Sequence, residues 1–227
     1  MTISCCCIIP CYNEARRVGG VLHTITQIEN IDEIICVDDG STDETAAVIR
    51  ERFPQVKLLR SESNRGKAAA VLWGARHTRC NFLFLVDADL QNIVADEFEY
   101  AISAIKINPE IDMLILRRVN KDPLTRLFRG DITVTGERVV RRSDFLRVME
   151  KQRVQGFQLE VALNQYMLDH GKDVRWHPIS SIGVISFRKM GLWAGLKKEI
   201  EMFPEILEFI GFRKMILQIL YLGRQRL

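Results

Sequence analysis

The chain has 227 residues, of which 47% are hydrophobic and 27% charged, and its formal net charge is +3. This composition is typical of a globular protein with a sizeable core, and it excludes an intrinsically disordered chain. The small net charge gives no reason to expect a nucleic-acid partner. No apolar run approaches the roughly 20 residues that a membrane-spanning helix needs. No basic segment precedes the first apolar run, so we expect no secretory signal.

The first half of the chain alternates short apolar runs with helix-like segments. The apolar runs predict five strands, at residues 3–9, 34–37, 56–59, 82–86 and 111–116. Four helices are predicted between them, at residues 14–27, 43–53, 67–78 and 94–107, and Asn13 is a suitable N-cap for the first. This alternation predicts an α/β fold with a mostly parallel sheet flanked by helices.

The second half differs in charge and pattern. Residues 117–153 hold eleven lysine and arginine residues against five acidic ones. A helix is predicted at residues 156–171, strands at 172–179 and 181–187, and amphipathic helices from residue 190 onward. We therefore expect one domain at residues 1–189 and an amphipathic helical appendage at 190–227.

Cysteine is used in a way that argues against disulfides and zinc. The six cysteines are Cys5, Cys6, Cys7, Cys11, Cys36 and Cys80. Three are consecutive within an apolar run, where neighbouring side chains of a strand point to opposite faces. The paired C-x-x-C spacing of zinc sites is absent from the sequence "CCCIIPC". We expect the cysteines to be small buried hydrophobic side chains in a reducing compartment, the cytoplasm.

The segment "FLFLVDADLQN" places two carboxylates directly after a buried strand. Burying a carboxylate is costly unless a partner offsets its charge. Asp87 and Asp89 point the same way in an extended chain, and Gln91 joins them if the chain stays extended. Two carboxylates and an amide oxygen suit Mg²⁺ or Mn²⁺. The alternative is a loop in which an aspartate caps the next helix, but the pair after an apolar strand favours the metal.

Other polar motifs follow neighbouring strands, and ligands of parallel α/β sheets bind beyond the carboxyl ends of the strands. "PCYNE" follows the first strand and "DDGSTD" the second. Asp38 and Asp39 should face opposite sides, one orienting the turn and one facing a ligand; ordinary turn chemistry is the alternative. Gly66 and Lys67 precede a helix, where a phosphate is favoured, although this motif on its own would indicate only a solvated lysine.

The motifs "IIPCYNEARRVGGVL", "IICVDDGSTDET", "NRGKAAAV" and "FLVDADLQ" together resemble the family 2 glycosyltransferases, which have the GT-A (Rossmann-like) fold. The resemblance extends from residue 3 to about residue 190. "DADLQ" and "GFQLEVAL" look most like polyprenyl-phosphate glycosyltransferases of the dolichyl-phosphate mannose synthase type. "GKAAA" and "TGERVVRRSDF" are also similar to glucosyl-3-phosphoglycerate synthases.

This resemblance implies roles for individual residues. It implies a nucleotide-sugar site formed by Pro10, Tyr12, Glu14, Asp39, Lys67 and Asp87. It also implies a metal site formed by Asp87, Asp89 and Gln91, with Asp89 as the main ligand and a catalytic residue. A divalent ion there would stabilise the charge that grows on the nucleoside-diphosphate leaving group.

The basic stretch at 117–153 is expected to border the sugar and to suit an anionic acceptor phosphate. Arg117 and Arg138 are the candidate acceptor-binding residues, and a solvated basic face is the alternative. Glu160 is the second candidate catalytic residue, as a general base for a hydroxyl acceptor. It could equally orient the acceptor loop, because a phosphate acceptor needs no base. His177 is interpreted as structural.

The tail combines apolar residues at helical spacing with basic flanks. "RKMILQILYLGRQR" is an apolar segment framed by arginine and lysine. Such a helix suits an anionic membrane surface on the cytoplasmic side. The alternatives are packing on the domain itself or on a second copy in a homodimer.

Together these observations predict a metal-dependent hexosyltransferase that moves a sugar from a UDP- or GDP-sugar to an anionic acceptor. A polyprenyl (dolichyl-type) phosphate is the preferred acceptor, and a soluble phosphorylated acceptor is the alternative. A sugar nucleotidyltransferase is disfavoured because no glycine precedes Gly19 in the loop after the first strand. A non-catalytic nucleotide-sugar-binding module is disfavoured by the intact "DADLQ".

Overall fold

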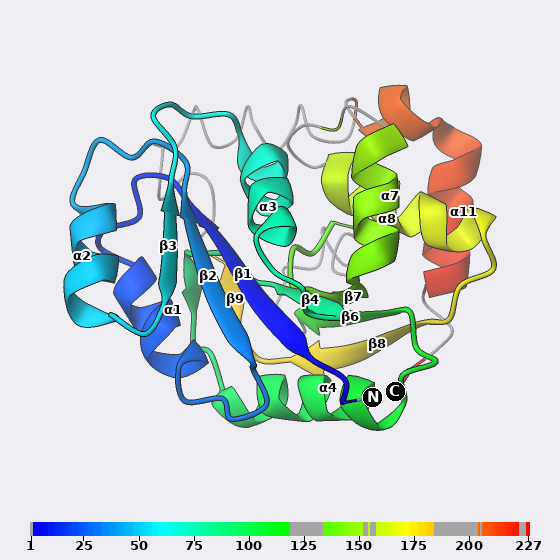
Figure 1. Ribbon diagram of the computed structural model, residues 1–227. Coiled ribbons are helices and arrows are strands. Elements are labelled where there is room, and N and C mark those ends of the chain that lie inside the picture. The colour runs from blue at the N-terminus through cyan, green and yellow to red at the C-terminus, as the bar shows by residue number, and fades with distance from the viewer. Residues whose placement is uncertain are drawn as a thin grey trace.

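A seven-stranded sheet crosses the molecule, with the strand order β3-β2-β1-β4-β7-β6-β8 (Figure 1). The computed structural model describes residues 2–118, 134–151, 154, 158–183, 204, 206–222 and 226–227. The strands are β1 (Cys5–Cys11), β2 (Glu33–Asp38), β3 (Lys57–Arg60), β4 (Phe82–Leu85), β6 (Met113–Arg118), β7 (Arg138–Arg141) and β8 (Val174–Ile179). Neighbouring strands are parallel except at β7, which is antiparallel to both β4 and β6.

Helices cover both faces of this sheet. One face packs against α1 (Val18–Ile25), α2 (Thr45–Arg52) and α4 (Ala95–Ile107). The other packs against α3 (Lys67–Arg76), α7 (Arg142–Lys151), α8 (Gln158–Asp169) and α11 (Phe212–Leu222) (Figure 1). A two-stranded ribbon joins β5 (Leu90–Gln91) to β9 (Ile182–Gly183). The predicted α/β fold with a mostly parallel sheet is confirmed.

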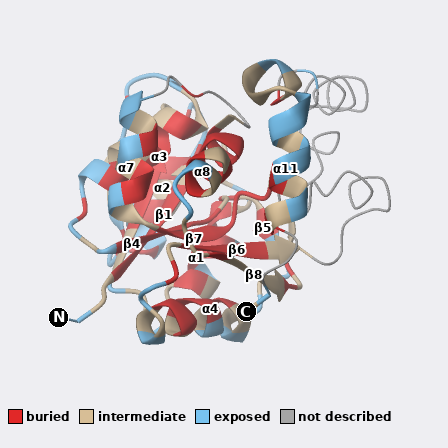
Figure 2. Cartoon of the chain, turned by 90° about the vertical axis from the view of Figure 1, so that its right-hand side faces the viewer, coloured by how far each residue is buried: buried red, intermediate tan, exposed pale blue. Residues whose placement is uncertain are grey.

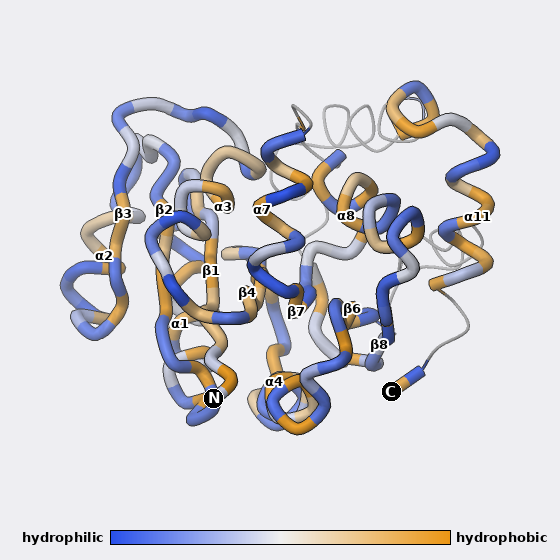
Figure 3. The backbone as a smooth tube through the Cα atoms, turned by 45° about the vertical axis from the view of Figure 1, so that its right-hand side comes forward, coloured by the Kyte–Doolittle hydropathy of each residue, from blue (hydrophilic) through white to orange (hydrophobic). Residues whose placement is uncertain are grey.

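The central strands are apolar throughout because both of their faces are covered. Cys5, Cys7 and Ile9 of β1 lie in the core on the side of α1 and α4. Cys6 and Ile8 lie in the core on the side of α3 and α8. Successive side chains of a strand alternate between faces, so a strand buried on both sides has no polar face. Figure 3 shows these strands as a mainly hydrophobic centre.

The cysteines are free thiols and serve as core residues, as predicted. Five of the six are buried, and Cys80 is half-buried. Burial raises the pKa of the thiols of Cys7 and Cys36, which keeps them protonated and uncharged in the core.

Two local features differ from the sequence prediction. The short strand β7 and the helix α7 were not predicted, because "RVVR" offers only two apolar residues between arginines. The first helix begins at Val18 rather than at residue 14. Asn13 is not its N-cap, because its φ of 55° places it in the left-handed region.

Hydrogen bonds to the next loop explain why residues 13–15 are not helical. The backbone N–H of Asn13 donates to Ser41 Oγ (2.9 Å), and that of Glu14 donates to Thr45 Oγ1 (2.8 Å). Asn13 Oδ1 accepts in return from the backbone N–H of Thr42 (2.9 Å). The loops after β1 and β2 are therefore built as one unit at the carboxyl edge of the sheet.

Gly40 lets this unit approach the next loop. Its φ is +78°, and an added Cβ would lie 2.6 Å from the backbone carbonyl carbon of Ser63. The backbone N–H of Ser61 donates to the carbonyl of Asp38 at 2.8 Å, which holds the two loops together. No side chain fits at position 40 without separating them.

We predict that Gly40→Ala lowers the free energy of unfolding by about 2 kcal/mol or more, through backbone strain and the clash with Ser63. Chemical denaturation measures this change. Gly20→Ala is the matched control, because Gly20 lies inside α1 and its Cβ would meet nothing within 4 Å. The control should keep or raise the stability, by up to about 1 kcal/mol. Equal losses in both variants would contradict the role of Gly40.

The described part of the tail packs on the domain through one face of α11. Gln218 and Leu222 are 1% exposed, and Gln218 Nε2 donates to the carbonyl of Val161 on α8 (3.2 Å). Tyr221 Oη donates to the carbonyl of Lys172 (3.0 Å). The expected boundary at residues 189–190 and the predicted strand residues 184–187 lie outside the described residues. Over the part of the chain that is described, no helix is long and apolar enough to cross a bilayer.

Candidate active site

The carboxyl edge of the sheet brings together segments from both halves of the chain. β1, β2, β4 and β6 all end at this edge. Because β7 is antiparallel, it begins there, with Arg138 paired to Leu85 of β4 and to Ile115 of β6. The segment before β7 therefore reaches the place where Asp87 follows β4 and where Arg118 ends β6.

An ion cluster occupies this edge and consists of Lys67, Asp87, Arg118, Glu137 and Glu160. Lys67 Nζ lies 2.8 Å from Asp87 Oδ1 and 2.9 Å from Glu160 Oε1. Arg118 donates from Nε to Glu137 Oε2 (2.8 Å) and from Nη2 to Glu137 Oε1. Arg118 Nη2 also lies 3.4 Å from Asp87 Oδ2. Asp87 is thus placed between two cations, which offsets the cost of a carboxylate at the end of a buried strand.

Lys67 is held as a cation by its surroundings. Burial disfavours its charge, but the carboxylates of Asp87 and Glu160 outweigh burial and raise the pKa of Lys67. Lys67 is the first residue of α3, and Gly66 before it has a φ of 90°. At the helix start Lys67 reaches the ion cluster, and its predicted contact with a nucleotide stays a prediction.

Gly136 leaves the room that this cluster needs. An added Cβ at this position would lie 2.8 Å from Asp87 Oδ2 and 2.8 Å from Lys67 Nζ. The backbone before β7 therefore passes directly over the contact between these two charges. The sequence "TGER" therefore contributes to the ion cluster through its glycine, Gly136, and its glutamate, Glu137.

Arg138 is fully buried at 0% exposure, and its guanidinium is used inside the protein. It donates to Thr135 O (2.5 Å), Asn164 Oδ1 (3.0 Å) and Glu160 O (3.3 Å). Burial lowers the pKa of Arg138, while the nearby carboxylates of Glu160 and Glu137 oppose that effect. Arg138 thus joins β7 to α8, and its side chain is not exposed to solvent. The predicted contact between Arg138 and an acceptor stays a prediction.

Arg117 was predicted to contact the acceptor, and that contact stays a prediction; its neighbour Arg118 is the one that joins the ion cluster. They are adjacent in β6, so their side chains point to opposite faces. The guanidinium of Arg117 lies over the ring of Trp176, 4.9 Å from its centroid, whereas Arg118 enters the ion cluster. Arg118 and Glu137 were not predicted as site residues, and strand alternation alone could not say which arginine faces the site.

The carboxylates of Asp38 and Asp39 accept hydrogen bonds from two different loops. Asp38 accepts from the backbone N–H of Ser41 (2.9 Å), which orients the turn after β2. The carboxylate of Asp39 accepts from the backbone N–H groups of Arg65 (3.0 Å) and Gly66 (2.7 Å). Asp39 therefore fixes the start of α3 and, with it, Lys67. Its predicted contact with a nucleobase remains a prediction.

The residues predicted to contact the nucleoside lie at the end of β1 and in the loop after it, and they differ in exposure. Tyr12 is 43% exposed, and Pro10 is half-buried at the end of β1. Glu14 is buried and forms an ion pair with Arg17 Nε at 2.5 Å. The structure brings this loop to the same edge as Asp39 and Asp87 without showing what it binds.

The predicted metal ligands suit a divalent ion by their chemistry. The side chain of Asp87 is 26% exposed, Asp89 is half-buried, and Gln91 is exposed in β5. Their oxygen atoms are the hard donors that Mg²⁺ and Mn²⁺ prefer. Across the described residues, no group of three His, Cys, Asp or Glu side chains is arranged to hold a metal ion. The two carboxylates would therefore need further ligands, such as phosphate oxygens or water.

Glu160 combines one paired and one unpaired oxygen. The residue is 3% exposed in the first turn of α8, and Oε1 contacts Lys67. Oε2 is buried and has no hydrogen-bond partner. An unpaired buried acceptor of this kind is suited to a hydrogen bond from a bound hydroxyl group. His177 lies elsewhere, with its ring 4.7 Å from that of Tyr100, in accord with a structural role.

A family model, Glycosyl transferase family 2, matches residues 6–161, a range that runs from β1 into α8 and contains the whole ion cluster. The chain belongs to glycosyl transferase family 2.

Two relatives and one set of structures illustrate the similarity. A dolichyl-phosphate beta-glucosyltransferase of Trichomonas vaginalis is 33% identical, over 57% of this chain and 46% of its own length. A 4,4'-diaponeurosporenoate glycosyltransferase of Staphylococcus aureus is 34% identical, over 47% of this chain and 29% of its own length. This family 2 chain thus spans less than half of the length of these relatives.

The fold is shared with glucosyl-3-phosphoglycerate synthase from Mycobacterium tuberculosis, solved with Mn²⁺, uridine diphosphate and glucosyl-3-phosphoglycerate. The TM-score is 0.68 at 16% identity, and the match covers 80% of this chain and 72% of that one. At this identity the similarity is one of fold, and it confirms the expected GT-A architecture.

We predict that Lys67→Met lowers the free energy of unfolding by about 2 kcal/mol, since it leaves the buried Glu160 without its cation. Urea denaturation measures the loss. Because the pKa of Lys67 is raised, its stabilisation is complete below the usual lysine pKa. The difference between wild type and variant should stay constant up to about pH 10 and shrink above it.

Lys57→Met is the matched control. Lys57 pairs with Glu33 at 3.3 Å, and its side chain is 44% exposed. An exposed pair contributes about 0.5 kcal/mol or less. A loss in Lys67→Met no larger than in this control would contradict the structural importance of the Lys67 contacts.

Proposed function

We propose that this chain is a metal-dependent glycosyltransferase that moves a sugar from a nucleoside-diphosphate sugar to an anionic acceptor, with a polyprenyl phosphate as the preferred acceptor. The observation that carries the proposal is the position of Asp87. Its partly exposed carboxylate follows β4 beside Asp89 and lies between Lys67 and Arg118. A carboxylate pair among cations suits a metal ion and a diphosphate together.

The donor side is formed by the three joined loops. The loop after β1, with Tyr12, and the turn that holds Asp39 would line the nucleoside. Lys67 would contact the diphosphate, since it is a cation at the start of α3, where anions are favoured. When bound, a divalent ion held by Asp87 and Asp89 would stabilise the charge on the leaving diphosphate. The bound Mn²⁺ and uridine diphosphate of the structural neighbour support this arrangement.

The acceptor side lies between β6, β7 and α8. Arg118 of β6 faces this side, and Glu160 lies in the first turn of α8. Arg118 and Lys67 are cations that suit an acceptor with an anionic group, and the dolichyl-phosphate enzyme among the relatives supports a lipid phosphate. The unpaired Oε2 of Glu160 favours a second candidate, a soluble phosphorylated acceptor that reacts through a hydroxyl group, with Glu160 as general base.

We predict that Asp89→Ala abolishes the stabilisation that Mn²⁺ with UDP or GDP gives to the wild type, while the variant remains folded. Thermal unfolding measures this, because a ligand that binds only the native state raises its melting temperature. Asp96→Asn on α4 is the matched control for a lost acidic charge and should respond as wild type does. Undiminished stabilisation of Asp89→Ala would remove Asp89 from the metal site.

The acceptor is tested with the same proteins. Transfer from UDP-glucose or GDP-mannose to a short polyprenyl phosphate is the expected result. Transfer only to a soluble phosphorylated hydroxy acid, together with its loss in Glu160→Gln, would favour the second candidate.

We further propose that the outer face of α11 contacts an anionic membrane surface. Phe212, Leu217 and Leu220 are 67%, 50% and 53% exposed, and Arg213 and Lys214 are exposed beside them. Figure 2 shows this exposed face, and Figure 3 shows how polar and apolar residues alternate along the helix. An amphipathic helix with basic residues is attracted to anionic lipids.

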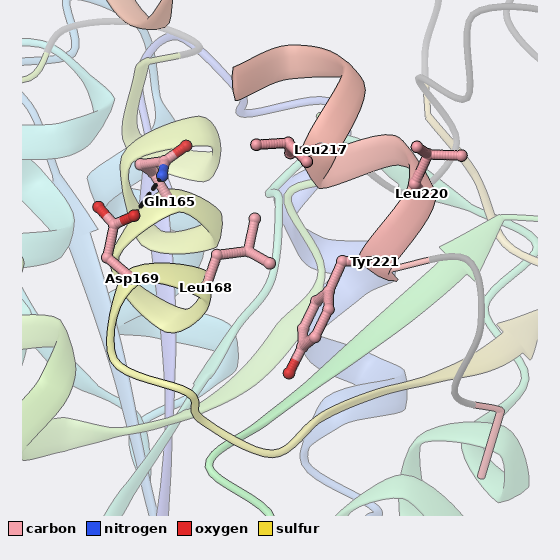
Figure 4. Close-up of a pocket in the computed structure, with 6 residues that line it drawn as sticks. All are labelled: Gln165, Leu168, Asp169, Leu217, Leu220 and Tyr221. Carbon is pink, nitrogen blue, oxygen red and sulfur yellow. Dashed lines mark hydrogen bonds between the residues drawn. The ribbon is translucent and has the colours of Figure 1, made fainter. Parts of the chain in front are cut away.

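A pocket lies beside this face, where α11 meets the domain (Figure 4). Its volume is about 350 Å³, and it lies between α8 and α11. It is lined by Gln165, Leu168, Asp169, Leu217, Leu220 and Tyr221. Leu217 and Leu220 therefore belong both to the exposed surface of α11 and to the pocket beside α8, the helix that carries Glu160.

We predict that Phe212→Ser combined with Leu220→Ser lowers binding to vesicles of phosphatidylglycerol by about tenfold, through loss of buried apolar area. Vesicle co-sedimentation measures the change. Ile107→Ser is the matched control, because Ile107 is 76% exposed on α4. Equal binding of both variants, or dimerisation of the wild type that the double substitution abolishes, would overturn the membrane role.

A further inference from the structure

Arg118 is shared unequally between two carboxylates. It forms a two-pronged contact with Glu137, through Nε (2.8 Å) and Nη2. The same Nη2 lies 3.4 Å from Asp87 Oδ2, a longer contact. Glu137 therefore has the shorter, two-pronged contact with Arg118, and Asp87 has one longer contact.

Glu137 is held in place for this contact. It is 0% exposed, and Thr135 Oγ1 donates to its Oε2 (3.0 Å). The backbone of β6 fixes its main chain, because the N–H of Leu116 donates to the carbonyl of Glu137 (3.0 Å). A buried carboxylate with three side-chain hydrogen bonds has little freedom to move.

The position of Glu137 matters because Asp87 already faces a second cation. Lys67 contacts the other oxygen of Asp87 at 2.8 Å. If Arg118 gave its full charge to Asp87, two cations would compete there with a divalent ion. Opposite charges at close range offset each other, so Glu137 reduces the effect of Arg118 on its neighbour.

We propose that Glu137 is a positioning residue that sets the affinity of the Asp87–Asp89 pair for a divalent ion by neutralising Arg118. This inference rests on the proposed metal-dependent function and adds a determinant that does not touch the metal. Glu137 acts through Arg118, and Gly136 gives the backbone before it the space to pass over Asp87 and Lys67. Partners one contact removed from a metal ligand commonly tune metal binding.

The test is Glu137→Gln, which keeps the shape of the side chain and removes its charge. We expect its apparent Kd for Mn²⁺, measured by calorimetry in the presence of saturating UDP and separately GDP, to rise about tenfold. The melting temperature without ligand reports folding separately. Asp112→Asn is the matched control, since Asp112 pairs with Arg141 and Lys172 at the opposite end of β6 and should leave the Kd unchanged.

A double variant separates charge from structure. Arg118→Gln with Glu137→Gln removes one charge of each sign, so the site has the same net charge as the wild type. The double variant leaves neither Arg118 nor Glu137 as an unpaired buried charge. Its Kd for Mn²⁺ can therefore still be measured if the single Glu137→Gln variant does not fold. We expect its Kd for Mn²⁺ to return to within about threefold of wild type.

Two results would overturn the inference. One is a folded Glu137→Gln variant that binds Mn²⁺ as tightly as wild type. The other is a double variant that binds about tenfold more weakly than wild type, which would make the pair a structural support only. A wild-type protein that binds no Mn²⁺ with either nucleotide would instead reject the metal-dependent function itself.

Discussion

Lys67 connects the parts of the molecule on which the candidate site depends. Its ammonium group contacts Asp87, which follows β4, and Glu160, which lies 93 positions away on α8. A cation between two carboxylates stabilises the fold when the three groups are held at close range. Here the side chain of Glu160 is buried, whereas those of Lys67 and Asp87 are 33% and 26% exposed. The loops and strands at this edge of the sheet hold the three groups in this arrangement.

This arrangement depends on hydrogen bonds between backbone N–H groups and side-chain oxygens along the edge of the sheet. The loop after β1 is hydrogen-bonded to the loop after β2, and Asp39 on that second loop holds the start of α3 through the N–H of Gly66. Each loop thus fixes the next, and the last one aims Lys67. The loop motifs therefore form one hydrogen-bonded unit.

The second half of the chain completes the site through an antiparallel strand. β7 enters between β4 and β6, so its first residues meet the last residues of its neighbours. Arg138 connects β7 to α8 by donating a hydrogen bond to the carbonyl of Glu160. Gln218 of α11 in turn donates to the carbonyl of Val161 on α8. The candidate catalytic centre and the exposed face of α11 are therefore two ends of one packed layer.

Much of this was determined by the sequence, because the relevant signals are local. Apolar runs and helix-like segments specify strands and helices by their own periodicity, and Asp87, Asp89 and Lys67 follow or begin such elements. The family membership and the parallel half of the sheet were predictable for the same reason.

Tertiary structure decided what depends on neighbours distant in sequence. It decided that Arg118 rather than Arg117 faces the site, and that Arg138 is buried. It also decided that Glu137 and Gly136 belong to the ion cluster. Adjacent residues of a strand look alike in sequence, and only the packing of β7 between β4 and β6 assigns each side chain its face.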